Sequence, residues 1–291
     1  MDAKRPTWAI ASDCQNRCVF CSQADAPIAV AASPPAKAAD QAPMTLGLIG
    51  GDPSTDPGLQ ARIASLKATG IRVGMQTHGR GLAETLPALV EAGLRDIHFS
   101  IHGPHAGLHD YHTGVEGSFE ESRASLRRAR DLGLTIAVTT VLTRSNYRVL
   151  AEFPAFLRRH RVTAWAIAGV RGVGRAATNY PRLQPSLSLA VPFALHALHQ
   201  AEREGIEPYT LDLPLCVLGP YARWSLTRSV GAYGQPCNDC PARPRCPGID
   251  PHYLDRFGPR ELRPRSLPPA RTLDAAPLFD GPGMPESETE P

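Results

Sequence analysis

No stretch of the 291-residue sequence is apolar for long enough to cross a lipid bilayer, and its first residues lack the hydrophobic core of a signal peptide. The sequence also lacks a strong excess of either charge, because its net charge is +3. Its two dense basic groups, 127–130 and 158–161, fall in helix-like segments, where a solvated helix face accounts for them. We therefore expect a soluble, cytoplasmic protein that has no membrane or nucleic-acid partner.

The sequence also gives no sign of a disulfide framework. It has seven cysteines, and in a cytoplasmic protein these indicate metal or redox chemistry. Cys14, Cys18 and Cys21 follow a short apolar run with the spacing C-x3-C-x2-C. A closed zinc site would need a fourth ligand, and no His, Cys, Asp or Glu follows Cys21 until Asp25. A disulfide would leave one thiol over. Both interpretations stay open, but three thiolates better suit a soft metal centre with one open coordination position.

The spacing, with Phe20 directly before the third cysteine, resembles the cluster loop of the radical S-adenosylmethionine (SAM) enzymes. The resemblance implies that Cys14, Cys18 and Cys21 are catalytic and hold a 4Fe–4S cluster. It also implies that the fourth iron is chelated by the amino and carboxylate groups of SAM.

A second motif, about thirty residues later, resembles the GGE-type turn that holds the SAM amino group in this family. It consists of Gly50, Gly51, Asp52 and Pro53, with Asp52 where Glu is commoner. Two residues without a Cβ allow the backbone to approach a ligand closely. Alone, the motif would be only a tight turn.

Other candidate SAM contacts lie where predicted strands end. The resemblance implies that Ser100 helps to bind SAM, and Thr77 occupies an equivalent strand end. We expect the pair Thr139 and Thr140, with Asn146 after them, to touch the ribose, and the glycine-rich segment 170–176 to approach the adenine. The SAM carboxylate lacks an expected partner, because Thr113 stands where some relatives have Arg. Three histidines of the same region are interpreted as hydrogen-bonded loop residues: His102, His109 and His112.

From residue 45 onward, strand-like and helix-like segments alternate, and glycines end most of the helices. This pattern predicts an α/β fold with a parallel sheet of six or seven strands and helices outside it. We expect strands over 8–11, 45–49, 71–77, 96–101, 135–142, 162–168 and 206–211. We expect helices over 59–69, 82–91, 118–131, 147–159 and 191–204. The resemblance suggests a partial (β/α)6 barrel, and we expect the Ala- and Pro-rich segment 22–43 to form no continuous helix.

We divide the chain into a core (1–211), a Cys-rich extension (212–263) and a Pro-rich tail (264–291) that we expect to be mostly disordered. The extension contains Cys216, Cys237, Cys240 and Cys246, the last three spaced C-x2-C-x5-C. This spacing resembles the SPASM or twitch extensions of radical SAM enzymes. Four thiolates suit one auxiliary 4Fe–4S cluster, which we favour over zinc. The fourth SPASM cysteine is replaced by Asp250, and with Cys216 as the fourth ligand a substitution of Asp250 should be nearly silent.

The resemblance implies reductive cleavage of SAM to a 5′-deoxyadenosyl radical, which abstracts hydrogen from a peptide or small natural product. We expect the auxiliary cluster to accept an electron, and an electron donor such as flavodoxin or ferredoxin. Because the sequence begins at its first strand, we expect a separate protein to present any peptide substrate. One alternative is a nucleotide-cyclising enzyme of the molybdopterin-precursor type, whose C-terminal Gly-Gly is missing here. Another is a non-catalytic iron–sulfur or zinc-binding protein.

Overall fold

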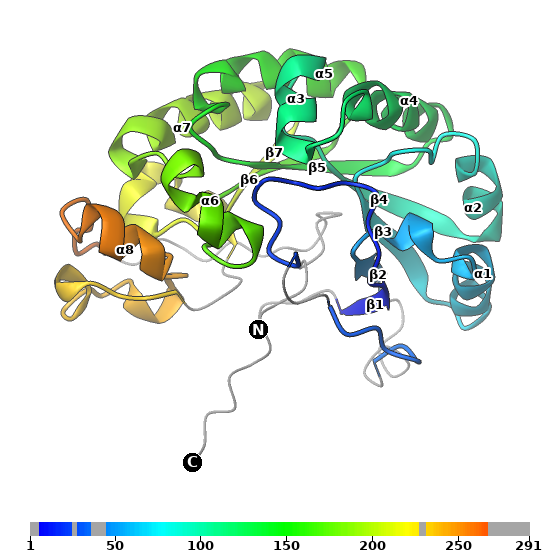
Figure 1. Ribbon diagram of the computed structural model, residues 1–291, viewed down its shortest axis with the longest axis horizontal. Helices are drawn as coiled ribbons and strands as arrows, with labels where there is room; N and C mark the ends of the chain where they lie inside the picture. Colours follow the sequence, from blue (N-terminus) through cyan, green and yellow to red (C-terminus); the bar gives the residue numbers. More distant parts are fainter. Residues whose placement is uncertain (1–5, 25–27, 36–44, 227–230, 267–291) are drawn as a thin grey trace.

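The computed structural model describes residues 6–24, 28–35, 45–226 and 231–266. Its centre is one curved sheet of parallel strands, which lie side by side in chain order (Figure 1). The strands are β1 (Thr7–Ala11), β2 (Thr45–Gly50), β3 (Arg72–Thr77), β4 (Leu94–Ser100), β5 (Thr135–Val141), β6 (Ala164–Ala168), β7 (Glu207–Leu211) and β8 (Ser225–Leu226). Among these described strands no ladder joins β8 to β1, so the barrel is open.

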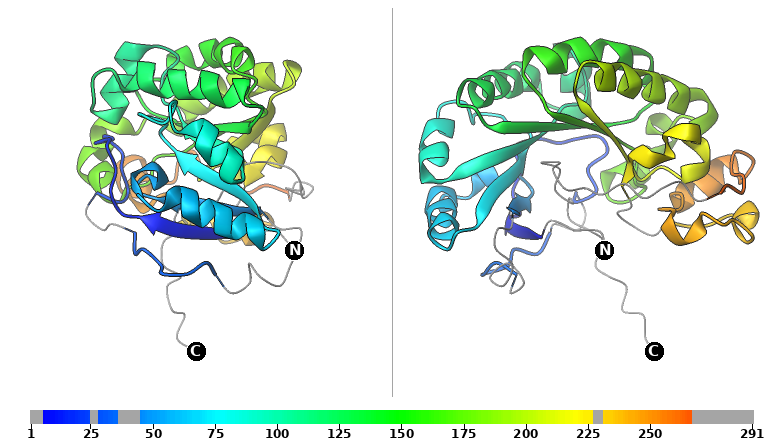
Figure 2. Two further views of the ribbon diagram at one scale, coloured as in Figure 1. Left: turned by 90° about the vertical axis from the view of Figure 1, so that its right-hand side faces the viewer. Right: turned by 180° about the vertical axis from the view of Figure 1, so that it is seen from behind.

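Helices cover the convex side of the sheet, as the front and back views both show (Figures 1 and 2). The α-helices are α1 (Leu59–Ala68), α2 (Leu86–Ala92), α3 (Ala106–Thr113), α4 (Ser118–Asp131), α5 (Phe153–Arg159), α6 (Arg175–Leu183), α7 (Leu187–Arg203) and α8 (Pro251–Phe257). The sheet side chains that face these helices are large and apolar. One row of paired residues on this face is Leu48, Met75, Ile97 and Ile136, all fully buried.

The concave side of the sheet carries smaller side chains. Successive residues of a strand point to opposite faces, so the register aligns Ser100, Thr139 and Ala166 in one inner row, with Val141 and Ala168 in the next. Small inner side chains leave space inside the barrel near the carboxyl ends of the strands. In parallel α/β folds these ends are where ligands bind.

The predicted fold class, a partial barrel with a parallel sheet, is confirmed. The predicted count of six or seven strands is wrong, because the described part of the chain already forms a sheet of eight. The extra strand, β8, has only two residues and pairs with β7. A segment this short leaves no periodic signal in the sequence. It lies in the expected extension, so that segment adds to the sheet of the core.

The predicted helix over 147–159 is divided. Residues Tyr147–Glu152 form a 3-10 helix, and α5 begins at Phe153. Pro154 has no N–H to donate to the preceding turn, so it fits only in the first turn of a new helix. For the same reason Pro87 marks the start of α2, which begins at Leu86 and not at residue 82.

Three helices were not predicted: α3, α6 and α8. Each is only seven to nine residues long. In addition, α7 begins at Leu187, earlier than the predicted residue 191. No helix occurs in the described parts of the segment 22–43, as expected. Most of the predicted tail, 267–291, lies outside the described residues, but residues 264–266 are part of the described structure. No described helix is long and apolar enough to span a membrane.

Candidate active site

The cysteine loop, residues 12–22, follows β1 and lines a cavity of about 600 Å³ at the carboxyl ends of the strands. Cys14, Cys18 and Cys21 all lie on the cavity wall. This volume is typical of small-molecule sites. Six other predicted site residues line the same cavity: Phe20, Gly50, Gly51, Asp52, Thr77 and Ser100.

Helix α3 holds the cysteine loop from one side through backbone hydrogen bonds. The N–H of Arg17 donates to the Thr113 carbonyl at 2.8 Å, and the N–H of Val19 donates to the His112 carbonyl at 2.9 Å. The loop approaches the end of α3 so closely that a Cβ on Gly114 would lie 2.8 Å from the Arg17 carbonyl oxygen. The last carbonyls of α3 thus accept hydrogen bonds from the cysteine loop, and Gly114 leaves room for that loop at the helix end.

Helix α6 holds the other side of the loop. Arg175 donates its backbone N–H to the Cys21 carbonyl at 2.9 Å and one guanidinium N–H to the Cys18 carbonyl at 2.8 Å. Asn179, one turn later, donates to the Val19 carbonyl at 3.0 Å. Three successive parts of the cysteine loop are therefore bound by one short helix. The glycine-rich approach to this helix was its main signal in the sequence.

The Gly50-Gly51 turn packs against the chain just before Cys14. The N–H of Gly51 donates to the Ala11 carbonyl at 2.9 Å. A Cβ on Gly50 would lie 2.1 Å from the Ala11 oxygen, and one on Gly51 would lie 2.3 Å from the Asp13 oxygen. Both glycines are therefore required by the close approach of two backbone segments, which brings the turn beside the cysteine loop.

The Asp52 carboxylate is fully buried and surrounded by donors from the chain. It accepts from Thr77 Oγ1 at 2.8 Å, from the backbone N–H of His78 at 2.8 Å and from the backbone N–H of Ser54 at 2.9 Å. Burial lowers the pKa of His78, so its imidazole is neutral beside this carboxylate. Asp52 and Thr77 thus fix the turn in place, and Pro53 continues it into a 3-10 helix outside the cavity lining.

Burial also acts on the cysteine thiols. Although Cys14 is exposed at the cavity wall, the surrounding protein raises the pKa of its thiol to about 11. Burial raises the pKa of Cys18 to about 12, and the neighbouring thiols Cys14 and Cys21 add to this increase. Three thiolates at this position therefore need positive charge nearby, such as that of a bound metal.

The positions of Thr140 and Asn146 do not support the predicted ribose contacts. Thr140 lies on the outer face of β5, where its hydroxyl donates to the Ile101 carbonyl at 2.7 Å and accepts from Trp165 Nε1 at 3.0 Å. The Asn146 amide is fully buried in the turn after β5, bonded to the backbone of Thr143 and Val141. Strand alternation presents Thr139 to the cavity instead.

Three histidines of the α3 region, His102, His109 and His112, pack beside the cysteine loop. The His102 ring contacts Phe20 at a centroid distance of 4.6 Å. His102 Nδ1 accepts from the Val141 N–H at 3.3 Å, and His109 Nδ1 accepts from the His102 N–H at 3.2 Å. His112 bonds to Leu108 and to hydroxyls of the loop after β5. Their interpretation as hydrogen-bonded residues agrees with these contacts, but His109 and His112 lie in helix α3 and not in a loop. His102 also lines the cavity.

Two arginines of the cavity wall, Arg171 and Arg175, were not predicted as site residues. They are the only arginines or lysines in its described lining. Both follow β6 and lie within the glycine-rich segment 170–176, so the signal was two basic residues among the glycines that follow a strand. Thr113, where an Arg was sought, is turned away and its hydroxyl lies 2.6 Å from Ser118 Oγ.

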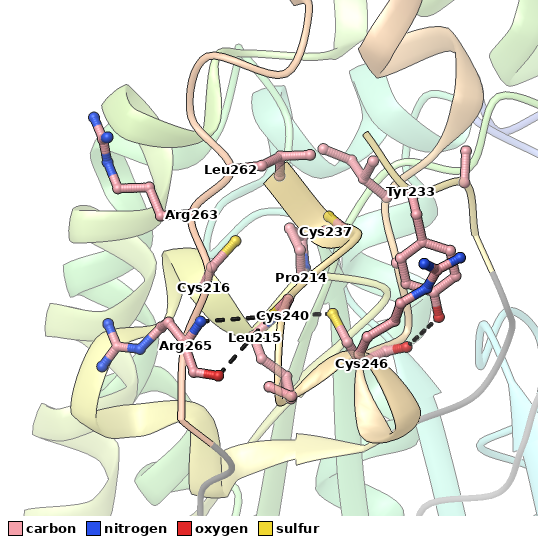
Figure 3. Close-up of a pocket in the computed structure, with 15 residues that line it drawn as sticks. Pro214, Leu215, Cys216, Tyr233, Cys237, Cys240, Cys246, Leu262, Arg263 and Arg265 are labelled. Atoms are coloured by element: carbon pink, nitrogen blue, oxygen red, sulfur yellow. Dashed lines mark hydrogen bonds between the residues drawn. The ribbon is translucent and has the colours of Figure 1, made fainter. Parts of the chain in front are cut away.

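The four remaining cysteines, Cys216, Cys237, Cys240 and Cys246, line one small pocket in the extension (Figure 3). Backbone N–H groups point at two of the sulfurs: Leu215 donates to Cys246 Sγ at 3.5 Å and Arg265 donates to Cys240 Sγ at 3.4 Å. Burial raises the pKa of both Cys216 and Cys246, and the nearby Cys237 adds to each increase. Asp250 is not part of this lining. Arg265 lies beyond the predicted extension boundary at residue 263.

A family model, the Radical SAM superfamily, matches residues 8–153, which contain the cysteine loop and the Gly50-Gly51 turn. This chain belongs to the radical SAM superfamily. The prediction made from the cysteine spacing is thereby confirmed, as is the prediction that the chain is an enzyme.

Two other proteins are similar to parts of this sequence. An AdoMet-dependent heme synthase of Nitratidesulfovibrio vulgaris is 31% identical over 129 residues, which are 44% of this chain and 35% of the relative. A PqqA peptide cyclase of Methylocella silvestris is 25% identical over 212 residues, covering 70% of this chain and 56% of the cyclase. The matches therefore span only about a third to a half of these relatives.

The radical SAM fold is also found in SuiB of Streptococcus suis, solved with S-adenosylmethionine and with its precursor peptide SuiA. The SAM-bound structure has a TM-score of 0.56 and 16% sequence identity, and the match covers 72% of this chain and 51% of SuiB. At this identity the similarity concerns the fold alone.

Proposed function

We propose that this radical SAM enzyme binds a 4Fe–4S cluster through Cys14, Cys18 and Cys21, with SAM in the adjoining cavity. The observation that carries the proposal is the convergence of three thiols and the Gly50-Gly51 turn on one cavity at the strand ends. This donor set fits the cluster, because three soft ligands leave one iron free for SAM. When bound and reduced, such a cluster supplies the electron that cleaves SAM to a 5′-deoxyadenosyl radical.

The chain's own residues bind and orient the cofactors in this proposal. Arg175 and Asn179 fix the carbonyls of the cysteine loop, and Gly50 and Gly51 allow SAM to approach the backbone. Arg171 and Arg175 supply positive charge in the cavity wall, which suits the SAM carboxylate left without a partner by Thr113. Ser100 and Thr139 offer hydroxyls on the inner face of the sheet.

We further propose that hydrogen is abstracted from a peptide, with a small natural product as the second candidate. The peptide cyclase matches 70% of this chain, whereas the heme synthase matches 44%, so the longer similarity favours a peptide. An electron donor such as flavodoxin or ferredoxin and a separate peptide-presenting protein belong to the same proposal.

The second cysteine set is proposed to hold an auxiliary 4Fe–4S cluster that accepts an electron. All four cysteines line one pocket, so four thiolates are available to a single metal centre. We favour the cluster over zinc because the C-x2-C-x5-C spacing resembles that of the SPASM or twitch extensions.

The catalytic part of this proposal predicts SAM cleavage without substrate. Anaerobically reconstituted protein treated with dithionite should slowly release 5′-deoxyadenosine, measured by chromatography. Cys18→Ala should reduce the release to background, because one iron of the cluster loses its ligand. Cys216→Ala is the matched control, since it removes a thiol outside the cavity. Release that persists in Cys18→Ala would contradict the assigned cluster site.

A further inference from the structure

Asp250 occupies the position between the Cys-rich extension and the loop that follows β6. Its side chain is 17% exposed. One carboxylate oxygen, Oδ2, accepts from the backbone N–H of Gly172 at 2.6 Å. The other, Oδ1, accepts from the N–H of His252 at 3.0 Å and so caps α8. One side chain thus satisfies a donor on each side of the boundary.

The fit around Gly172 is tight. A Cβ on this glycine would lie 2.3 Å from His252 Nδ1 and 2.8 Å from Asp250 Oδ1. The loop 169–174 therefore has direct contact with α8. Its turn is closed by the Val173 N–H, which donates to the Arg171 carbonyl at 2.8 Å.

The same loop continues directly into the contacts that hold the cysteine loop. Arg175, three residues after Gly172, binds the Cys18 and Cys21 carbonyls. At the other end, Asp250 lies four residues after Cys246, whose sulfur faces the Cys-rich pocket. The two cysteine sets are thus linked by the short chain segment from Cys246 to Asp250 and by the hydrogen bonds from Asp250 through Gly172 and Arg175.

We propose that Asp250 is a positioning residue that holds the loop 169–174, and with it Arg171 and Arg175, in the geometry that binds SAM. The inference rests on the proposed function and deepens it. It replaces the expectation that substitution of Asp250 is nearly silent with a measurable effect. At the position where the SPASM pattern has a cysteine, this chain has a carboxylate that joins the extension to the SAM cavity.

Asp250→Asn tests this role, because Asn still caps a helix but offers one acceptor oxygen in place of two. The one amide oxygen can accept from Gly172 or from His252 but not from both in the present geometry, so the link between the loop and α8 should be broken. Asp255→Asn is the matched control, since Asp255 is exposed on the same helix and carries the same charge. Gly172→Ala disturbs the same contact from the opposite side.

The first measurement is hydrogen exchange of the reconstituted protein without SAM. Asp250→Asn and Gly172→Ala should speed exchange about tenfold over 169–175 and over the cysteine loop, because the loss of a charge-assisted hydrogen bond favours local opening. Asp255→Asn should leave both segments unchanged. Unchanged exchange in Asp250→Asn would overturn the proposal, and this result does not depend on SAM binding.

The second measurement is a SAM titration followed by the EPR spectrum of the reduced cluster. Asp250→Asn should raise the half-saturating SAM concentration about tenfold, while the cleavage rate at saturating SAM and the iron content stay at wild-type values. The double variant with Gly172→Ala should be no weaker than either single variant. Loss of iron in Asp250→Asn, or wild-type SAM affinity, would overturn the positioning role. A wild-type protein that shows no response to SAM would instead contradict the proposed function.

Discussion

At the scale of single residues, the site separates side chains that face the cavity from side chains that hold the wall in place. Asp52 and Thr77 both line the cavity, yet they hydrogen-bond to each other and to the chain. Their main effect is to fix the Gly50-Gly51 turn against the start of the cysteine loop. In the proposed function this leaves the turn's backbone, and not these two side chains, to meet the SAM amino group.

The histidines that pack near Phe20 are uncharged at neutral pH, and they support the cysteine loop through hydrogen bonds and ring contacts. His109 and His112 are fully buried, and burial lowers the pKa of each to about 4. In the unfolded chain both should titrate near 6.5. Because the unfolded state takes up these protons first, acid favours unfolding between the two values.

This difference predicts a pH dependence of stability. The free energy of unfolding should be unaffected by these groups above pH 6.5 and should fall by about 1.4 kcal/mol per pH unit for each imidazole as the pH falls to about 4. Denaturant unfolding at several pH values measures the slope. His109→Gln keeps an acceptor for the His102 N–H and removes one titrating group, so its slope should be shallower by about 1.4 kcal/mol per unit. Equal slopes would contradict the assignment.

At the scale of elements, α6 is the helix on which the cysteine loop depends most. Its N-cap, Gly174, has φ +58° and ψ −139°. A Cβ there would lie 2.6 Å from the Cys21 carbonyl oxygen and 2.8 Å from that of Ser22. A side chain would therefore push α6 away from the cysteine loop.

Gly174→Ala should consequently lose bound iron. We expect the variant to retain less than half of the iron of the SAM-binding cluster after gel filtration, because Cys21 is displaced. Gly205→Ala is the control, since Gly205 has φ +78° and a Cβ on it would meet nothing within 4 Å. Both substitutions place a side chain at positive φ and so strain the backbone, but only one touches the loop. Equal iron loss in both would show that strain, not contact, is responsible.

The elements also show how far sequence reasoning extends. Long periodic segments were predicted well, and α4 was placed at its observed bounds, because a helix of this length has a clear apolar face. The short helices α3, α6 and α8 were missed, since tertiary contacts stabilise them more than their own sequence does. The cysteine spacing predicted the family, but the contacts from Arg175 and Asn179 depend on residues about 160 positions away and could not be read locally.

Thr140 and Asn146 illustrate the same limit within the candidate site. Their place near a strand end was predicted, but which neighbour faces the cavity depends on the register between β4, β5 and β6. A shift of one residue exchanges Thr139 for Thr140. Composition and spacing do not determine which of these two residues faces the cavity.

At the scale of the whole molecule, an open barrel carries the Cys-rich extension at its β8 end, far from β1 (Figures 1 and 2). The extension is joined to the core by Asp250 and by Glu261, which accepts from the N–H groups of Leu187 and Ser188 at the start of α7. A carboxylate at a helix N-terminus is favourable. The extension therefore also helps to begin a helix of the core.

This arrangement makes the metal content a test of the whole molecule. If both cysteine sets hold cubanes, the anaerobically reconstituted protein should contain about eight irons per chain. Cys240→Ala removes one of four thiolates in the extension and should bring the content to about four. Stoichiometric zinc with four irons would contradict the auxiliary cluster and leave the catalytic cluster intact.

The role of the extension then follows from two products measured side by side in Cys240→Ala. If the second cluster accepts an electron from the substrate radical, 5′-deoxyadenosine release should stay within about twofold of wild type. Product should fall more than tenfold, because hydrogen abstraction occurs but oxidation cannot finish. A purely structural extension would act through its contacts to α7 and the loop after β6, so both readouts would fall together.

Cys18→Ala provides the comparison, because it should abolish both by removing the first step. A parallel loss in Cys240→Ala, in protein whose circular dichroism spectrum is unchanged, would count against electron acceptance and favour a structural role for the extension.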